Sequence, residues 1–339
     1  MRATGAPAAG EARASDRPCG GEGSRWVLGG AALSDPALAV VLAADGRFVV
    51  PALTTMFSIV RSLQPKGAGV HFIVLDCGIS RKGIDHLLGV TRSWDGRASV
   101  ELQLLPPGAL DDAPVHHHFS AAACARLLLP ELRPDLDRVL YIDSDTVVRD
   151  DLRPLAMMRL GANEVGAAAG DFAFPTVAEG LPAGTWESGR EAGQRYFNSG
   201  VLLMECRRWR QEQLGPKMLR YLAEHATTNR LADQDAINGV IGQRLHVLPP
   251  RMNYQVYGVA QRFALRVAPD ARRAAVLHFV GGKPWQADGL TRNPTSVWAR
   301  RQWYQALDES GALTWRHRQR MRASSLGAQV RRLRARSSV

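Results

Sequence analysis

Two aspartates separated by one residue, Asp143 and Asp145, directly follow the apolar run Arg138–Ile142. The run has the composition of a buried β-strand, and parallel α/β sheets bind their ligands where such strands end. Two carboxylates at this place can hold a hard divalent cation such as Mg²⁺ or Mn²⁺, with substrate phosphates as further ligands. Aspartates also cap ordinary turns, so this spacing alone does not establish a metal site.

The elements that must position this pair alternate between strand-like and helix-like segments. Apolar runs typical of buried parallel strands occur at Ala37–Ala44, Val70–Leu75, Val100–Leu105, Arg138–Ile142, Glu164–Ala168, Gly200–Glu205, Leu245–Leu248 and Ala275–Phe279. Helical spacing predicts helices at Val50–Leu63, Ser120–Leu129 (closed by Pro130), Trp209–His225 and Gln234–Ile241. This rhythm predicts an α/β fold with a Rossmann-like, mostly parallel central sheet flanked by helices.

Length and composition fit one folded domain with an extension at each end. The 339 residues are 45% hydrophobic, an ordinary value for a globular chain. We expect a flexible leader at residues 1–35, a folded domain at 36–305 and a basic tail at 306–339. No apolar stretch approaches the ~20 residues of a membrane helix, and the leader lacks the hydrophobic segment of a secretory signal. We therefore expect a cytoplasmic protein.

The positive charge is concentrated in the tail. Eight arginines and no acidic residue lie between Arg316 and Val339, and removing these eight from the net charge of +11 leaves +3. Leu326, Val330 and Leu333 form an apolar stripe within it, so the tail could lie on an anionic membrane surface at the inner face of the plasma membrane, or be solvated. No aromatic-studded basic face accompanies the charge, so we expect no nucleic-acid partner.

The four cysteines, Cys19, Cys77, Cys124 and Cys206, are scattered and include no C-x-x-C pair. This excludes a zinc module and a disulfide framework, and reduced thiols fit the cytoplasm. For the last three we expect buried, unreactive packing.

Five different segments, spread along the chain, carry motifs that occur in the same order in a known family. They are LAADGRFVVPALTTMFSIV, CARLLLPELRPDLDRVLYIDSD, RYFNSGVLLMECRRWR, ADQDAINGVI and VLHFVGGKPW. Over about residues 39–285 they resemble glycosyltransferase family 8, which includes bacterial lipopolysaccharide galactosyl- and glucosyltransferases and the glycogenins. The resemblance implies a GT-A type fold and a metal-dependent, retaining transfer of galactose or glucose. The implied donor is a UDP-sugar, and the implied acceptor is a glycan or glycolipid of lipopolysaccharide-like biosynthesis.

The resemblance also implies a role for each matching residue. The implied protein ligands of Mn²⁺ or Mg²⁺ are Asp143, Asp145 and His278, and imidazole suits Mn²⁺. The implied donor contacts are Ala43, Asp45, Arg126, Ser144, Gly281 and Lys283. The residues implied around the transferred hexose are Asp171, Asn198, Asp233 and Gln234. Of these, Asp233 and Gln234 are the candidates for the reacting face.

The chain departs from the family pattern after Asp45. Gly46 replaces the second acid, and Arg47-Phe48 replaces Asn-Tyr. Phe48 can still stack on a base, whereas Arg47 can contact a phosphate or face solvent. A preference for uridine is therefore less defined than metal binding. Within His116–His118, His118 falls where the family has a histidine near the donor.

Retention of configuration allows two routes. A double displacement needs a carboxylate beneath the anomeric carbon, and Asp233 or Asp171 could serve. In a same-face route the leaving phosphate accepts the acceptor's proton while Gln234 shields the reacting centre. We expect the same-face route.

Two other functions compete with this prediction. YIDSDTV also matches the first motif of haloacid-dehalogenase-type phosphatases, in which Asp143 would be the nucleophile and Asp145 the general acid. Such a fold needs a downstream lysine, and Lys217 is loosely placed for that role. The second alternative is an inactive sugar-nucleotide-binding homologue.

Overall fold

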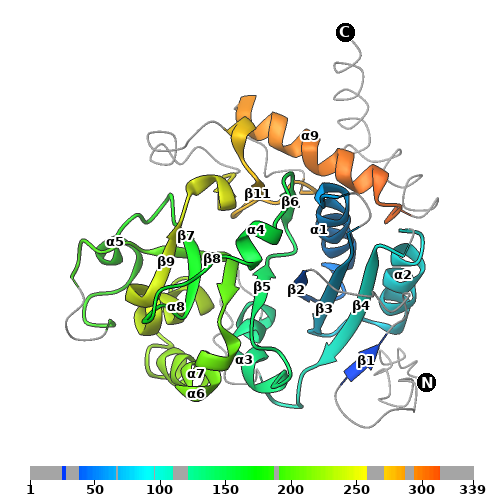
Figure 1. Ribbon diagram of the computed structural model, residues 1–339. Coiled ribbons are helices and arrows are strands. Elements are labelled where there is room, and N and C mark those ends of the chain that lie inside the picture. The colour runs from blue at the N-terminus through cyan, green and yellow to red at the C-terminus, as the bar shows by residue number, and fades with distance from the viewer. Residues whose placement is uncertain are drawn as a thin grey trace, which may run out of the picture.

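The computed structural model describes residues 25–27, 38–65, 68–94, 96–109, 121–186, 191–257, 271–286 and 294–313 (Figure 1). An eight-stranded sheet with the order β1-β4-β3-β2-β5-β8-β7-β9 runs through this part, and a three-stranded sheet has the order β10-β11-β6. The strands are β1 (Arg25–Val27), β2 (Ala39–Ala44), β3 (Val70–Asp76), β4 (Ala98–Leu104), β5 (Val139–Ile142), β6 (Thr146–Val148), β7 (Gly166–Gly170), β8 (Phe197–Met204), β9 (Leu245–Leu248), β10 (Tyr254–Gln255) and β11 (Val276–His278).

Helices cover both faces of the large sheet. They are α1 (Val49–Ser62), α2 (Arg81–Thr91), α3 (Ala125–Leu132), α4 (Arg153–Ala156), α5 (Val177–Gly180), α6 (Cys206–Gln211), α7 (Leu214–Glu224), α8 (Asp233–Ile241) and α9 (Pro294–Glu309). Alternate residues of β2 pack on opposite sides, because side chains alternate along a strand. Val40 and Leu42 join a core with α1, α2 and α9, whereas Val41 joins a core with α3, α7 and α8.

The predicted mostly parallel sheet is confirmed. Strands β4, β3, β2 and β5 are mutually parallel, and β7 is parallel to β9. Strand β8 lies antiparallel between β5 and β7, and all of its residues are buried. A strand covered on both faces is apolar whichever way it runs, so its direction was not readable from its composition.

The single helix predicted over Trp209–His225 is wrong, because the chain forms two helices there. Helix α6 ends at Gln211, and Gln213 takes a left-handed conformation with φ 53° before α7 begins. Pro216 lies in the first turn of α7, where its missing N–H needs no partner. The proline therefore starts a new helix instead of interrupting an old one.

Pro130 has the opposite effect to the one predicted. A 3₁₀ turn at Ala121–Cys124 precedes α3, which continues through Pro130 to Leu132. The N–H of Arg133 still donates to the carbonyl oxygen of Leu129 at 3.0 Å. The loss of one hydrogen bond in the last turn is thus tolerated, and Pro130 does not end the helix.

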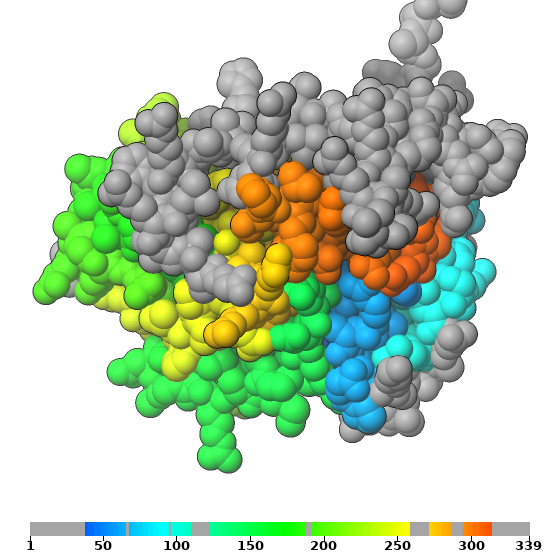
Figure 2. Space-filling view, turned by 90° about the horizontal axis from the view of Figure 1, so that it is seen from above, coloured from blue at the N-terminus to red at the C-terminus, as the bar shows by residue number. Residues whose placement is uncertain are grey.

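The folded part extends beyond both expected boundaries. Residues 25–27 of the expected leader form β1, which pairs with β4. Helix α9 passes residue 305 and lies along α1 and residues 271–286 (Figure 2). After it, the carbonyl oxygen of Ser310 accepts from Trp94 Nε1 at 3.1 Å, and that of Ala312 lies 2.7 Å from His86 Nε2. The arginine-rich segment with its apolar stripe falls outside the described residues.

Among the helices described, none has the length and apolar character needed to span a membrane. Three of the cysteines are also described: Cys124 and Cys206 are buried, Cys77 is half-buried, and all three are free thiols. Burial raises the pKa of each of these thiols to about 12. The unreactive packing predicted for them follows from this environment.

We predict that Gly215→Ala destabilises the protein by about 1–3 kcal/mol, because an added Cβ would lie 2.4 Å from the backbone oxygen of Leu127 where α7 crosses α3. Gly89→Ala is the matched control, since a Cβ in this exposed part of α2 would meet nothing within 4 Å. The control should gain up to about 1 kcal/mol from its higher helix propensity. Urea unfolding of both variants checks the opposite signs; equal stabilities would contradict the close helix contact.

Candidate active site

The polar residues singled out by the sequence gather where β2, β5 and β7 end. Because β8 is antiparallel to β5, its first residues lie at the same edge, and the N–H of Asp143 donates to the carbonyl oxygen of Gly200 at 2.8 Å. Asp171 directly follows β7, and Asn198 lies in β8. This edge of the sheet is where α/β folds bind ligands.

Helix α1 and strand β2 hold the turn that carries the two aspartates. The hydroxyl of Thr55 lies 3.0 Å from the carbonyl oxygen of Ser144 and 2.9 Å from that of Thr146. Ser144 Oγ in turn donates to the carbonyl oxygen of Ala43 at 2.7 Å. Ala43 and Ser144, both predicted donor contacts, are therefore adjacent, and the turn is anchored from two elements.

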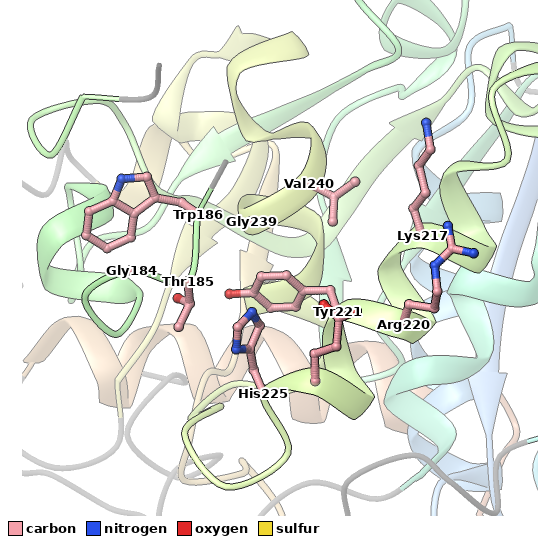
Figure 3. Close-up of a pocket in the computed structure, with 10 residues that line it drawn as sticks. Gly184, Thr185, Trp186, Lys217, Arg220, Tyr221, His225, Gly239 and Val240 are labelled. Atoms are coloured by element: carbon pink, nitrogen blue, oxygen red, sulfur yellow. The ribbon is translucent and has the colours of Figure 1, made fainter. Parts of the chain in front are cut away.

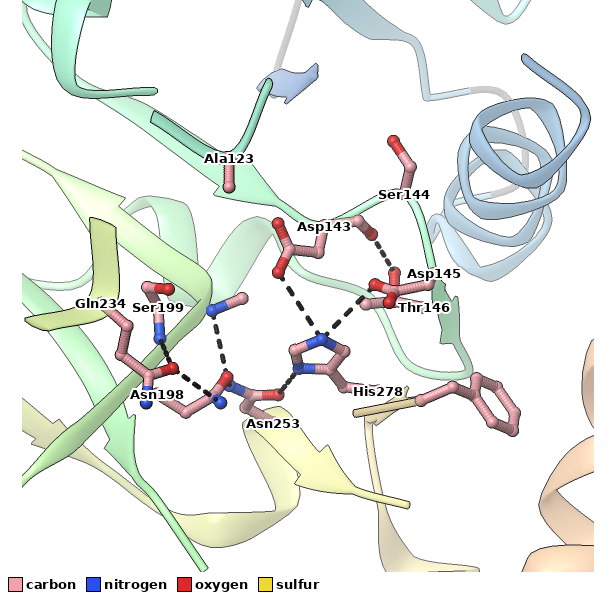
Figure 4. A network of polar contacts seen from close by, with 12 residues as sticks. Ala123, Asp143, Ser144, Asp145, Thr146, Asn198, Ser199, Gln234, Asn253 and His278 are labelled. Atoms are coloured by element: carbon pink, nitrogen blue, oxygen red, sulfur yellow. Dashed lines mark hydrogen bonds and ion pairs between the residues drawn. The ribbon is translucent and has the colours of Figure 1, made fainter. Parts of the chain in front are cut away.

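His278 reaches the same turn through the small sheet. Strand β11 pairs antiparallel with β6, and His278 lies opposite Thr146. His278 Nε2 is 3.5 Å from Asp143 Oδ2 and 3.4 Å from Asp145 Oδ1 (Figure 4). One potential ligand atom from each of the three residues lies within 4.8 Å of the others. The structure thus brings the three predicted metal ligands together.

The other oxygens of the two aspartates have partners already. Asp143 Oδ1 accepts from Arg126 Nη2 at 2.8 Å and from the Tyr141 hydroxyl at 3.2 Å. Asp145 Oδ2 accepts from the ammonium group of Lys283. Only the oxygens that face His278 remain, so one oxygen of each carboxylate and a ring nitrogen converge on a common point.

The convergent atoms fit a divalent cation. His278 Nδ1 lies 3.0 Å from Asn253 Oδ1, and a neutral ring that donates this bond from Nδ1 presents the lone pair of Nε2 to the two carboxylates. Three acceptors then face one another. Adjacent ligand atoms around an octahedral ion with bonds of ~2.1 Å lie ~3 Å apart, close to the 3.5 and 3.4 Å that separate His278 Nε2 from the two carboxylate oxygens.

The surroundings of Asp145 and Asp233 shift the pKa values of these two carboxyl groups in opposite directions. Burial opposes ionisation of Asp145, but Lys283 and His278 outweigh it and lower the pKa of this carboxyl below its usual range. For Asp233 burial dominates, and although Arg126 opposes it, the pKa of Asp233 rises to about 6. Asp145 is therefore an anion at neutral pH, whereas Asp233 changes its protonation state around pH 6.

Gly200 leaves the space that His278 fills. A Cβ at this position would lie 2.1 Å from His278 Cε1 and 2.8 Å from Asp143 Oδ2. The glycine of the Asn-x-Gly segment is therefore required by the close approach of the imidazole to the strand. No side chain can be added here without moving a predicted ligand.

Three of the four residues predicted around the hexose, Asp171, Asn198 and Gln234, form one hydrogen-bonded group, whereas Asp233 pairs with Arg126. Asp171 Oδ2 accepts from Asn198 Nδ2 at 3.1 Å and from Gln234 Nε2 at 3.2 Å. Gln234 Oε1 accepts from Asn198 Nδ2 at 3.0 Å and from the N–H of Ser199 at 3.2 Å (Figure 4). Asp171 Oδ1 accepts from the backbone N–H groups of residues 173 and 174. Both oxygens of Asp171 are thus occupied.

Arg126 connects the triad of Asp143, Asp145 and His278 with the residues predicted around the hexose. Its side chain is 3% exposed, and its guanidinium lies 4.1 Å above the Tyr141 ring. Besides its bond to Asp143, Nη1 donates to the carbonyl oxygen of Ser199 at 2.7 Å, and Nε is 3.1 Å from Asp233 Oδ2. The guanidinium of Arg126, a predicted donor contact, is therefore paired with two carboxylates.

The residues predicted to contact the donor after β2 bond or pack against neighbouring residues of the protein. Asp45 Oδ1 accepts from the N–H of Arg47 at 2.7 Å, and Arg47 Nη2 lies 3.1 Å from Asp45 Oδ2. Phe48 packs edge to face on Trp285, with ring centroids 5.7 Å apart. Gly281 has φ +78° in the turn that precedes Lys283, a conformation that favours glycine. His118 lies outside the described residues.

Lys217 does not take part in this site. It lies in α7 and lines a cavity of about 370 Å³ with Trp186, Tyr221 and His225 (Figure 3). None of the predicted site residues lines that cavity. The lysine beside the aspartate pair is Lys283 and not Lys217, the residue that the phosphatase alternative assigned to this role.

Three contributors were missed in the sequence. Thr55 anchors the aspartate turn, Tyr141 donates to Asp143, and Asn253 bonds His278. Tyr141, as the polar member of the buried run before Asp143, was the one that could have been noticed. Thr55 and Asn253 act across long separations in the chain, which no local pattern reports.

Comparison with known proteins identifies one family. The model of the family described as Glycosyl transferase family 8 matches residues 39–289. General stress protein A of Bacillus subtilis (strain 168) is 28% identical over 246 residues, which are 66% of this chain and 79% of that protein. Glycosyltransferase GlyF of Streptococcus pneumoniae serotype 4 is 25% identical over 80% of this chain, but the match spans only 62% of GlyF.

A solved structure has the same fold. The galactosyltransferase LgtC, crystallised in complex with donor and acceptor sugar analogs, superposes with a TM-score of 0.67 and 25% sequence identity. The match covers 83% of this chain and 99% of that chain. The fold is therefore of the GT-A type. With a family model that spans most of the folded part and a site that matches it, the chain belongs to glycosyltransferase family 8.

Proposed function

We propose that the protein is a metal-dependent, retaining glycosyltransferase that moves a hexose, galactose or glucose, from a UDP-sugar to a glycan or glycolipid acceptor. The observation that carries the proposal is the convergence of Asp143 Oδ2, Asp145 Oδ1 and His278 Nε2 on one point. A Mn²⁺ or Mg²⁺ ion held by these atoms would offset the charge of a departing diphosphate. Relatives that share the family support the transfer of a sugar.

Charged groups around the triad suit a diphosphate. The ammonium group of Lys283 is 22% exposed and lies at the rim of the triad, where it can serve as a point charge for phosphate. Backbone N–H groups near Gly281 can approach the same anion. The residues that form the site therefore combine positive charge with a ligand set for a cation.

The contacts of the carboxylates support different tasks on the sugar side. Asp171 accepts four hydrogen bonds, which lower its nucleophilicity and suit a residue that orients hydroxyl groups. Asp233 is left as the carboxylate that could lie beneath an anomeric carbon, but it is paired with Arg126. These engagements favour the same-face route, in which Gln234 shields the reacting centre and no glycosyl-enzyme forms.

The acceptor and the site of action belong to the proposal as well. LgtC was crystallised with an acceptor sugar analog, and a lipopolysaccharide 1,2-glucosyltransferase of Escherichia coli (strain K12) is 27% identical over 44% of this chain. A glycan or glycolipid acceptor is therefore the class to test first. For the arginine-rich tail we propose contact with an anionic membrane surface, which would keep the enzyme near a lipid-linked acceptor.

We predict that UDP is released from one UDP-hexose in a panel of UDP-, GDP- and ADP-sugars, and that chelator or Asp145→Ala abolishes the release. The reason is that Asp145 supplies one of the three convergent ligands and also pairs with Lys283. Asp137→Ala, at a side chain 69% exposed, is the matched control and should keep the rate. No nucleotide release from any donor, together with phosphate release from p-nitrophenyl phosphate, would support the phosphatase instead.

We predict that Gly200→Ala weakens Mn²⁺ binding about 10–100-fold, because the added methyl group must displace His278 or Asp143. Isothermal titration of Mn²⁺ into the protein measures the change. Gly193→Ala is the control, since a Cβ there meets nothing within 4 Å. Unchanged Mn²⁺ affinity in Gly200→Ala would show that His278 does not ligate the ion.

The raised pKa of Asp233 predicts opposite effects of pH on activity and stability. The transfer rate should fall as pH drops through about 6, because the ionised carboxylate that pairs with Arg126 is lost. The contribution of Asp233 to stability is present below its unfolded pKa of 3.8 and is lost as pH rises through about 6. Asp233→Asn should remove both trends, as measured by transfer rates and urea unfolding between pH ~5 and ~7. A wild-type rate that stays level across this range would argue against an ionised Asp233 in the reaction.

A further inference from the structure

Asn253 lies between the triad and the hexose residues and has no assigned role. It ends the 3₁₀ turn Pro250–Asn253 and is completely buried. Its Oδ1 is 3.0 Å from His278 Nδ1, and its Nδ2 donates to Asn198 Oδ1 at 2.8 Å. Asn198 Nδ2 donates in turn to Asp171 Oδ2 at 3.1 Å. A continuous chain of hydrogen bonds therefore runs from Asp171 to His278. Figure 4 shows its members Asn198, Asn253 and His278.

The direction of this chain is determined by two groups that can act in only one way. A carboxylate such as Asp171 only accepts, so the amide nitrogen of Asn198 must point toward it. The backbone N–H of Gly200 only donates, and it lies 3.1 Å from Asn198 Oδ1. Both conditions give Asn198 the same orientation, with its oxygen toward Asn253. Asn253 must then present its nitrogen to Asn198 and its oxygen to His278.

We propose that Asn253 is a positioning residue that keeps the proton of His278 on Nδ1 and so reserves Nε2 as a metal-ligating atom. This inference rests on the proposed metal-dependent function. The two carboxylates beside Nε2 would otherwise attract that proton to Nε2, where it would block ligation. Asn253 offers Nδ1–H a buried acceptor, so the tautomer that can ligate is retained.

The same chain of bonds connects recognition of the sugar with the ion site. Asp171 and Asn198 are predicted hexose contacts, and their orientation passes through Asn253 to the imidazole. Because every member is buried and bonded, no water is needed to complete the path from residue 171 to residue 278.

Two substitutions separate the acceptor role of Asn253 from a general packing role. Asn253→Leu keeps the approximate volume and removes the acceptor, whereas Asn253→Asp keeps an acceptor for Nδ1–H. Gln255→Leu is the matched control: Gln255 is a buried amide two residues away whose side chain bonds residues 170, 172 and 257, although its backbone lies opposite His278 in the small sheet.

The experiment measures Mn²⁺ affinity and the electron spin-echo modulation from a coordinated imidazole nitrogen, with and without UDP. The modulation is assigned to His278 by its loss in His278→Ala. We expect Asn253→Leu to bind Mn²⁺ about 10–100-fold more weakly and to lose the nitrogen modulation. Asn253→Asp and Gln255→Leu should keep the modulation, even if Gln255→Leu lowers thermal stability.

Each result bears on a different part of the proposal. Wild-type protein that binds no Mn²⁺ under either condition would overturn the metal-dependent function and this inference with it. Wild-type affinity and modulation in Asn253→Leu would overturn the positioning role alone. Loss of modulation in Asn253→Asp as well would show that the bond to Asn198, and not the acceptor for Nδ1–H, is what holds the imidazole.

Discussion

The structure depends above all on one requirement: the N–H groups of the buried guanidinium of Arg126 must each have a hydrogen-bond acceptor. Arg126 is 3% exposed, and its partners come from α8, β5, β8 and the 3₁₀ turn before α3. Leaving one such partner out strands a charge in a low-dielectric interior, which costs several kcal/mol. The elements that carry Asp143, Ser199 and Asp233 are therefore tied to one point, which connects the triad of Asp143, Asp145 and His278 with Asp233.

The fold was predictable where burial leaves an unambiguous pattern. The short apolar runs that form β2, β3 and β5 favour buried strands, and the structure confirms them. What could not be predicted depends on contacts outside the segment. The direction of β8 is set by its neighbours β5 and β7. Pro130 and Pro216 are chemically alike, yet one lies inside a helix and the other in a first turn, because their positions relative to the hydrogen-bonding pattern differ.

The motifs predicted the potential metal ligands of the candidate site, but not the residues that orient them. The three residues of the triad were found because their order along the chain resembles a family, and the structure brings their ligand atoms within 4.8 Å. The residues that orient them were not found. Thr55 and Asn253 each act on residues elsewhere in the chain, and a threonine within a helix or an asparagine after a turn is unremarkable by itself. Local patterns identify groups that react, whereas the groups that orient them become visible only in three dimensions.

Sharing one guanidinium between two carboxylates gives the site a further property. Asp143 and Asp233 both use Arg126, and the negative charge of Asp143 contributes to the raised pKa of Asp233. A positive charge close to Asp143 therefore offsets the negative charge of this carboxylate, which lowers the pKa of Asp233 and favours its ionisation. The ionisation of Asp233 is in this way coupled to the charge at Asp143, without movement of the backbone. The coupling follows from Coulomb interactions in a buried site, where they are screened far less than in water.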